Sequence, residues 1–162
     1  MTRNSLGWAK RAAWLLLLAL IVAGCGNGQG YFTVTRVIDG DTFAIKIQDK
    51  EERVRLIGVD TPETKGPGKE LEPYGVEAKD FTRRLLQGKR VRLELDVREK
   101  DRHGRILAYA YLSDGTFVNA KLVQEGYARV MTVPPNVRFA DLFLQLEREA
   151  RVDRRGLWGL QP

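Results

Sequence analysis

Short stretches in which apolar and polar residues alternate recur along this chain, and turn residues rich in Asp and Gly separate them. The clearest stretch is 90–97, where Val or Leu alternates with Arg, Glu or Asp at every step. Alternation with a period of two is typical of strands that bury one face and expose the other. Stretches rich in strand-forming residues, several of them alternating and bounded by turn residues, occur at 31–38, 42–47, 53–59 and 105–112.

Helical patterns are inserted between these strands and follow the last of them. A helix is predicted over 73–86, with Pro73 at its start and Gly88 beyond its end. Two further helices are predicted over 118–125 and 138–151. Five strands with helices inserted or appended indicate the α+β class. The strand-rich part has the size of a five-stranded OB-type β-barrel, so we expect such a barrel with three helices.

The first 24 residues are interpreted as a segment that does not belong to this domain. A basic start is followed by an apolar run at 12–23, which is short for a membrane span and suits a secretory signal. The run ends in Val22-Ala23-Gly24-Cys25, which resembles the end of a bacterial lipoprotein signal peptide. We therefore expect residues 1–24 to be a lipoprotein signal peptide. The alternatives are an ordinary signal peptide with an incidental cysteine, or an uncleaved N-terminal anchor.

Cys25 is the only cysteine of the chain, so a disulfide within the chain is impossible. A single cysteine at this place is better explained by lipid attachment than by redox chemistry, and two acyl chains anchor a protein stably. We expect residues 25–30 to be a lipidated cysteine and a flexible Gly-rich linker, and residues 31–162 to be the folded domain. The protein would then be held outside the cytoplasm, at a bacterial cell surface or in the envelope.

The net charge is only weakly informative. The whole chain carries +6, and removal of the three basic residues of the signal leaves 24 basic against 21 acidic residues, or +3. An excess of this size does not by itself indicate binding to nucleic acid.

Three polar segments, 39–42, 55–64 and 101–105, carry the residues that suit chemistry. Carboxylate oxygens are ligands that a hard cation prefers, and planar guanidinium groups bind phosphate through two parallel hydrogen bonds. The combination suits cleavage of a phosphodiester. The segments supply carboxylates at Asp41, Asp60 and Glu63, and guanidinium groups at Arg55 and Arg105.

The order and content of these segments resemble the staphylococcal nuclease family. The resemblance rests on 38–42, 55–64 and 104–109, with support from 73–78 and 156–158, and it extends over most of the expected domain. It implies an OB-fold barrel with three helices. It also implies calcium-dependent cleavage of DNA and RNA that leaves 3′-phosphate products, by a monomer that needs no protein partner.

The resemblance also implies which residues would hold calcium. Asp41, Asp60 and the backbone carbonyl of Thr61 would be the protein ligands. Calcium takes roughly six to eight oxygen ligands, so water and a phosphate oxygen of the substrate would complete the coordination. Two carboxylates do not discriminate well among oxygen-binding cations, and the choice of calcium therefore rests on the resemblance.

By the same resemblance, Arg55 and Arg105 would contact one phosphate from two sides and stabilise the charge of the transition state. Glu63 would act on the attacking water, either as a general base or by orienting it. Two other functions remain as alternatives: a catalytically weak OB-fold module that binds nucleic acid, and a structural or adhesion lipoprotein. Retention of all three residues argues against the first of these.

Three local expectations remain. Strict alternation from Arg55 would place Asp60 on the opposite face of the strand, so we predict a bend or bulge near Gly58. Asp39 and His103 are interpreted as structural or turn residues. After Val130 the chain continues with Met131-Thr132-Val133, where well-known family members have tyrosines that pack around the nucleotide, so base stacking on that side is not expected.

Overall fold

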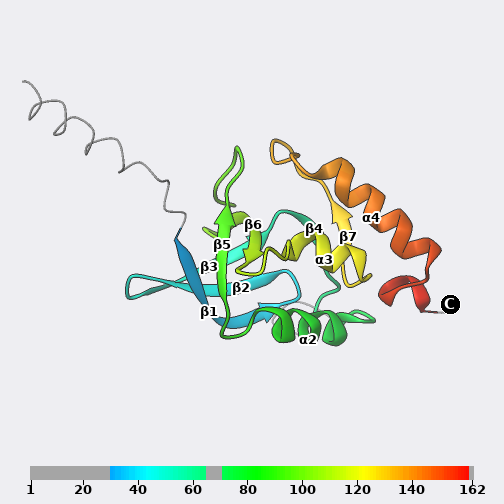
Figure 1. The fold of residues 1–162 in the computed structure, drawn as a ribbon, viewed down its shortest axis with the longest axis horizontal. Helices are drawn as coiled ribbons and strands as arrows, with labels where there is room; N and C mark the ends of the chain where they lie inside the picture. The colour runs from blue at the N-terminus through cyan, green and yellow to red at the C-terminus, as the bar shows by residue number, and fades with distance from the viewer. Residues whose placement is uncertain (1–29, 65–70, 161–162) are drawn as a thin grey trace, which may run out of the picture.

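A five-stranded barrel forms the centre of the molecule (Figure 1). The computed structural model describes residues 30–64 and 71–160, so the expected signal peptide, Cys25 and most of the linker lie outside the described residues. Within these ranges the strands close in the order β1-β2-β3-β6-β5, which confirms the predicted barrel. The strands are β1 (Tyr31–Asp39), β2 (Thr42–Ile47), β3 (Lys50–Leu56), β5 (Arg90–Glu94) and β6 (Ile106–Leu112).

Three α-helices and a small second sheet surround the barrel in the part of the chain that is described. Helix α2 lies along the barrel beside β1, and α3 lies between the barrel and α4 (Figure 1). None of these helices is long and apolar enough to cross a membrane, among the residues described. The elements are α2 (Gly75–Leu86), α3 (Val118–Gln124), α4 (Ala140–Val152), the 3₁₀ turn η1 (Gly156–Gly159), and the sheet of β4 (Gly58–Asp60) with β7 (Arg129–Met131).

Strand pairing brings the expected site residues together. β1, β2 and β3 form an antiparallel meander, in which Thr42 pairs with Asp39 on one side and with Arg55 on the other. β3 then pairs with β6 in parallel, and Arg55 lies opposite Leu107. Arg105, which immediately precedes β6, therefore lies next to the end of β3 although fifty positions separate it from Arg55.

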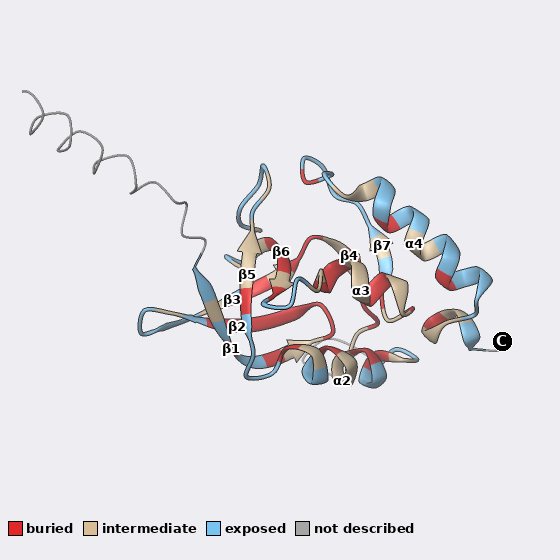
Figure 2. Ribbon diagram, in the orientation of Figure 1, coloured by how far each residue is buried: buried red, intermediate tan, exposed pale blue. Residues whose placement is uncertain are grey.

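The core lies inside the barrel and beneath α3 and α4 (Figure 2). Apolar side chains from every barrel strand are fully or almost fully buried, as the alternation predicts. Burial of this kind contributes about 25 cal/mol for each Å² of apolar surface that is removed from water. The largest buried side chains include Val34, Phe43, Ile45, Val54, Leu56, Leu86, Val91, Tyr109, Leu122 and Phe143.

Several predicted boundaries shift for local reasons. The strand expected over 90–97 ends at Glu94, because the Asp96 carboxylate turns back to accept hydrogen bonds from Val97 N at 3.0 Å and from the Tyr109 hydroxyl at 2.9 Å. The first helix begins at Gly75 and not at Pro73, because Tyr74 has a left-handed φ of 73°. The last helix spans Ala140–Val152 in place of 138–151.

The predicted bend at Gly58 is confirmed. The stretch expected as one strand over 53–59 is divided at Ile57 into β3 and β4, and Gly58 has a φ of 78°. Buried Asn119 on α3 holds the junction, because its Nδ2 donates to the Ile57 carbonyl at 2.9 Å. β4 therefore leaves the barrel and pairs with β7, which turns Asp60 toward the face that carries Arg55.

Gly58→Ala is expected to lower the free energy of unfolding by about 2–4 kcal/mol. A Cβ at this position would meet the Phe143 ring at 2.6 Å, in addition to the cost of its positive φ. Gly88→Ala is the matched control, because Gly88 has a similar φ of 72° and open space around the added Cβ. Urea unfolding of both variants measures the difference, and equal losses would show that contact with Phe143 adds nothing.

Candidate functional site

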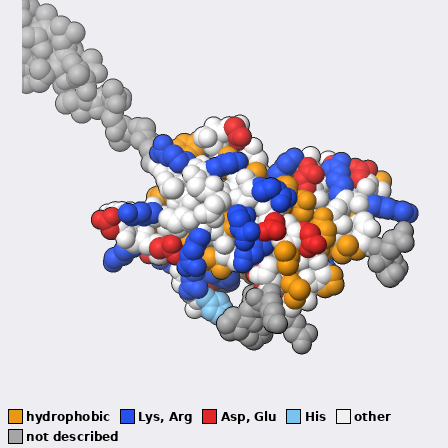
Figure 3. All heavy atoms as spheres, turned by 90° about the horizontal axis from the view of Figure 1, so that it is seen from below, with side chains coloured by type: hydrophobic (Ala, Val, Ile, Leu, Met, Phe, Trp, Pro, Cys, Tyr) orange, Lys and Arg blue, Asp and Glu red, His pale blue; other side chains and the backbone are white. Residues whose placement is uncertain are grey.

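A polar groove at the ends of β1, β2 and β3 brings together four of the expected site residues. Its volume is about 410 Å³. Asp60 and Thr61 join the same cluster through hydrogen bonds with the groove residues. Basic side chains are spread over the whole of the face shown in Figure 3, and hydrophobic side chains are exposed on it toward the helices. The groove is lined by Asp39, Asp41, Thr42, Arg53, Arg55, Glu63, His103 and Arg105.

Asp41 is the most deeply buried carboxylate of the groove. The turn between β1 and β2 directs it inward, and its side chain is only 4% exposed. Its Oδ1 accepts from the Thr42 hydroxyl at 2.9 Å, and its Oδ2 accepts from Thr61 N at 3.0 Å and from the Thr61 hydroxyl at 3.2 Å. Gly40 permits this approach, since a Cβ there would lie 2.6 Å from Thr61 Oγ1. The turn at 39–42 and the segment after β4 are therefore joined at Asp41.

Arg55 bridges the two carboxylates that were expected to bind metal. Its Nη1 pairs with Asp41 Oδ2, and its Nη2 donates to Asp60 Oδ1 at 2.8 Å and to the Val59 carbonyl at 3.3 Å. The Arg55 side chain is 12% exposed, and that of Asp60 is 41% exposed. Asp41 and Asp60 therefore pair with the two Nη nitrogens of one guanidinium.

This donor set fits a hard cation. Asp41 and Asp60 each direct a carboxylate oxygen at the guanidinium of Arg55, so both lie beside the same positive group, and oxygen ligands are those that calcium prefers. The described residues contain no cluster of three or more His, Cys, Asp or Glu side chains that could hold a metal ion alone. A cation held by the two carboxylates would need further oxygen ligands and would compete with Arg55 for these two.

Glu63 lies beside Asp39, which sequence reasoning treated only as a structural residue. Burial raises the pKa of the Asp39 carboxyl, and contact with Glu63 raises it further. Asp39 Oδ1 also accepts from Gly40 N at 3.0 Å and from the Thr64 hydroxyl at 3.2 Å. Asp39 therefore holds the segment that contains Glu63 against the turn that contains Asp41.

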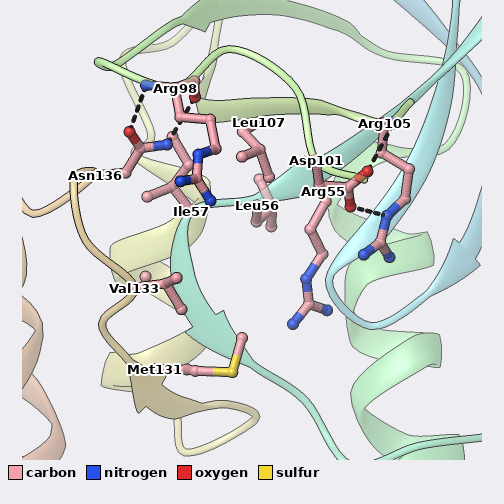
Figure 4. A pocket seen from close by; sticks show the side chains of 11 residues that line it. Arg55, Leu56, Ile57, Arg98, Asp101, Arg105, Leu107, Met131, Val133 and Asn136 are labelled. Carbon is pink, nitrogen blue, oxygen red and sulfur yellow. Dashed lines mark hydrogen bonds and ion pairs between the residues drawn. The ribbon is translucent and has the colours of Figure 1, made fainter. Parts of the chain in front are cut away.

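Arg105 is oriented by Asp101, a contact that sequence reasoning missed (Figure 4). Arg105 Nε donates to Asp101 Oδ2 at 2.6 Å, while Asp101 Oδ1 accepts from the backbone N–H groups of Arg105 and His103. Burial acts to raise the pKa of the Asp101 carboxyl, but these hydrogen bonds outweigh it and hold the pKa below its ordinary value. The spacing Asp-x-x-Gly-Arg was the available signal, since a carboxylate four residues before an arginine can bind it across a tight turn.

Comparison with known proteins agrees with this geometry. Residues 53–159 match the family described as staphylococcal nuclease homologue. The chain belongs to the staphylococcal nuclease family. It is 48% identical to the thermonuclease of Staphylococcus intermedius over 132 residues, and the aligned region covers 82% of this chain and 77% of that protein. It is 44% identical over 137 residues to the thermonuclease of Staphylococcus hyicus, which covers 84% of this chain and 80% of that protein. An endonuclease of Bacillus subtilis is 41% identical over 128 residues, which is 78% of this chain and 60% of that protein.

In this staphylococcal nuclease fold the structure places every expected site residue except Cys25, which lies outside the described residues. Asp41, Arg55, Glu63 and Arg105 line one groove. His103 also lines it and forms part of the turn that Asp101 closes, which agrees with its interpretation as a turn residue.

Proposed function

We propose that this protein is a calcium-dependent nuclease that hydrolyses phosphodiester bonds of DNA and RNA and leaves 3′-phosphate ends. Membership of the staphylococcal nuclease family makes it a hydrolase of phosphodiester bonds. The observation that carries the proposal is the convergence of two carboxylates, two guanidinium groups and Glu63 on one groove. The choice of calcium and of these substrates comes from the resemblance to the family. The proposed ligands are all oxygen atoms, which is compatible with calcium.

Each of these residues has a proposed role that suits its chemistry. Asp41, Asp60 and the Thr61 carbonyl would hold calcium, which as a hard cation supplies positive charge beside a phosphate oxygen. Arg105 directs the Nη groups of its fork away from Asp101, because Nε is already bound, and these groups can bind and stabilise a phosphoryl group as its charge grows. Arg55 lies at the same groove and can contact a second oxygen of that phosphate.

Glu63 would act on the water that attacks phosphorus. In the proposed reaction the water oxygen bonds to phosphorus, the bond to the 5′-oxygen breaks, and that oxygen receives a proton. Glu63 lines the groove together with both arginines, from where it can take the proton of the water or orient it. Breaking the bond to the 5′-oxygen leaves the phosphate on the 3′ side, as the proposed products require.

Glu63→Ser is expected to lower kcat for DNA cleavage by about 10²–10⁴-fold, the usual contribution of a general base. Purified wild type and variant would be assayed on DNA and on RNA with calcium and with a chelator, and the product ends would be tested for 3′-phosphate. A wild type that binds nucleic acid but degrades none in calcium would establish the alternative, a catalytically weak OB-fold binding module. Products with 5′-phosphate ends would overturn the proposed bond cleavage.

Asp101→Asn is expected to lower kcat by about 10-fold, since a neutral amide holds the Arg105 fork less firmly than a carboxylate does. Because the effect acts through Arg105, it should vanish when Arg105 is already alanine, as a double-mutant cycle would show.

Urea unfolding gives a second readout for Asp101→Asn. The lowered pKa means that Asp101 stabilises the fold above about pH 4 and that this contribution is lost as the pH falls further. Wild type and variant should therefore differ in stability at pH 7, and the difference should be lost as the pH falls through the pKa of Asp101 in the folded protein.

We also propose that the protein is lipid-anchored at Cys25, outside the cytoplasm, and acts as a monomer on nucleic acid that reaches the cell surface or envelope. The proposal is supported by the order of basic start, apolar run and Ala-Gly-Cys in the sequence. Cys25→Ser should release the protein from membranes or block its processing. Mass spectrometry that finds a mature N-terminus other than a lipidated Cys25 would refute the anchor.

A further inference from the structure

A second, mostly apolar pocket adjoins the catalytic groove (Figure 4). Its volume is about 180 Å³, and it shares Arg55 and Arg105 with the groove. A phosphate bound by these two arginines would therefore place an attached nucleoside within reach of this pocket. The apolar wall consists of Leu56, Ile57, Leu107, Met131 and Val133.

Two hydrogen bonds hold the backbone of Arg98 at the rim of this pocket. Arg98 N donates to Asn136 Oδ1 at 2.8 Å, and Asn136 Nδ2 donates to the Arg98 carbonyl at 2.8 Å. Asn136 is itself buried, with 5% of its surface exposed. This pair of hydrogen bonds ties the loop after β5 to the turn after β7, and it sets the direction in which the Arg98 side chain leaves the backbone.

The Arg98 guanidinium extends along Ile57 into the pocket (Figure 4). No hydrogen bond or ion pair joins this guanidinium to any of the described residues. The two side chains of the lining that carry hydrogen-bond acceptors are already engaged, Asp101 with Arg105 and Asn136 with the Arg98 backbone. Arginine carries five N–H donors and no acceptor, so the pocket offers a substrate mainly hydrogen-bond donors above an apolar wall.

We propose that Arg98 selects between the purines at the base next to the cleaved bond and favours guanine over adenine. Guanine presents two adjacent acceptors, N7 and O6, which match the two parallel N–H groups of a guanidinium. Adenine presents N7 beside the N6 amino donor, which opposes a donor of Arg98. This inference rests on the proposed nuclease function, and it concerns a residue that the bond cleavage itself does not use.

The test measures cleavage positions in short single-stranded DNA. Otherwise identical oligonucleotides would carry guanine, adenine, inosine or 7-deazaguanine at one position, and initial rates at the bonds beside it would be compared in calcium. Wild type should cut beside guanine about five-fold faster than beside adenine. Inosine, which keeps N7 and O6, should behave as guanine does. 7-Deazaguanine, which lacks N7, should be cut at about the adenine rate.

Arg98→Ala should abolish these differences, so that the substrates with guanine, inosine, adenine and 7-deazaguanine are cut at equal rates. Arg90→Ala is the matched control, because Arg90 is an exposed arginine at the other end of β5 beside Tyr31, outside the pocket; it should keep the guanine preference. A wild type that cuts all four substrates equally would overturn the role of Arg98 and leave the nuclease function intact. An equal loss at every base in Arg98→Ala would overturn it too, in favour of a phosphate contact. No cleavage by wild type would refute the nuclease function itself.

Discussion

Arg105→Ala is expected to lower kcat for DNA cleavage by about 10³-fold, because an arginine that stabilises the transferred phosphoryl group contributes 10³–10⁵ in related chemistry. Arg105 occupies the groove with its Nε held by Asp101 at 2.6 Å, so its remaining N–H groups are oriented before substrate binds. Such preorganised donors act mainly on the transition state. KM should therefore change much less than kcat, which steady-state kinetics on a defined oligonucleotide measure.

Arg102→Ala is the matched control for this experiment. Arg102 lies on the same turn, but among the described residues it donates only to His103, and it is exposed, so kcat should stay within about two-fold of wild type. Arg105→Lys tests the fork, since lysine keeps the charge and loses the planar pair of donors. If Arg105→Ala lowers kcat by less than ten-fold, Arg105 does not have the proposed role in the site. If Arg102→Ala lowers kcat as much as Arg105→Ala does, the effect comes from a general loss of surface charge.

Asp41→Ala and Asp60→Ala should both abolish calcium-dependent cleavage yet differ in stability. Asp41 is buried, accepts three hydrogen bonds and pairs with Nη1 of Arg55, a side chain that is only 12% exposed, so its loss leaves these buried donors without their acceptor and should cost about 2–4 kcal/mol. Asp60 is 41% exposed, and loss of an ion pair at such a position should cost less than about 1 kcal/mol. Urea unfolding without calcium measures both values.

Removal of calcium from wild type separates the proposed metal-binding role of Asp41 from its role in the stability of the fold. A chelator should abolish cleavage and lower the melting temperature only by the linkage expected for a lost ligand, because Arg55 pairs with both carboxylates in the described fold. Persistence of cleavage in either aspartate variant would refute the metal assignment. Equal stability losses in the two variants would show that burial of Asp41 does not decide its structural contribution.

The residues proposed for catalysis could be predicted from the sequence because they lie within short segments of strong local character. Asp41 lies in a turn, Arg55 lies in an alternating strand, and Glu63 follows the bend that Gly58 permits. Strand periodicity also predicts the buried side chains of the barrel, since each side chain alternates between the interior and the surface. The end of the strand at Glu94 was missed because the competing hydrogen bonds of Asp96 depend on Tyr109, which lies on another strand.

The contacts that organise the site were less accessible from the sequence. Asp101 is close to Arg105 in the chain, so its contact could have been inferred from spacing. Arg98 is held by Asn136, which lies thirty-eight positions away in a different loop. Side chains on irregular backbone follow no period, and their partners depend on how distant segments meet.

The amino-acid pattern by itself determined the class of fold, the residue types available for phosphodiester chemistry and the need for a bend at Gly58, because these follow from local periodicity and from the φ that glycine permits. Only the tertiary structure decided that Arg55 lies between Asp41 and Asp60, and that the Arg98 guanidinium enters the apolar pocket. Those arrangements depend on closure of the barrel through the parallel pairing of β3 with β6 and on the sheet of β4 with β7. Both join segments that local preferences alone do not bring together.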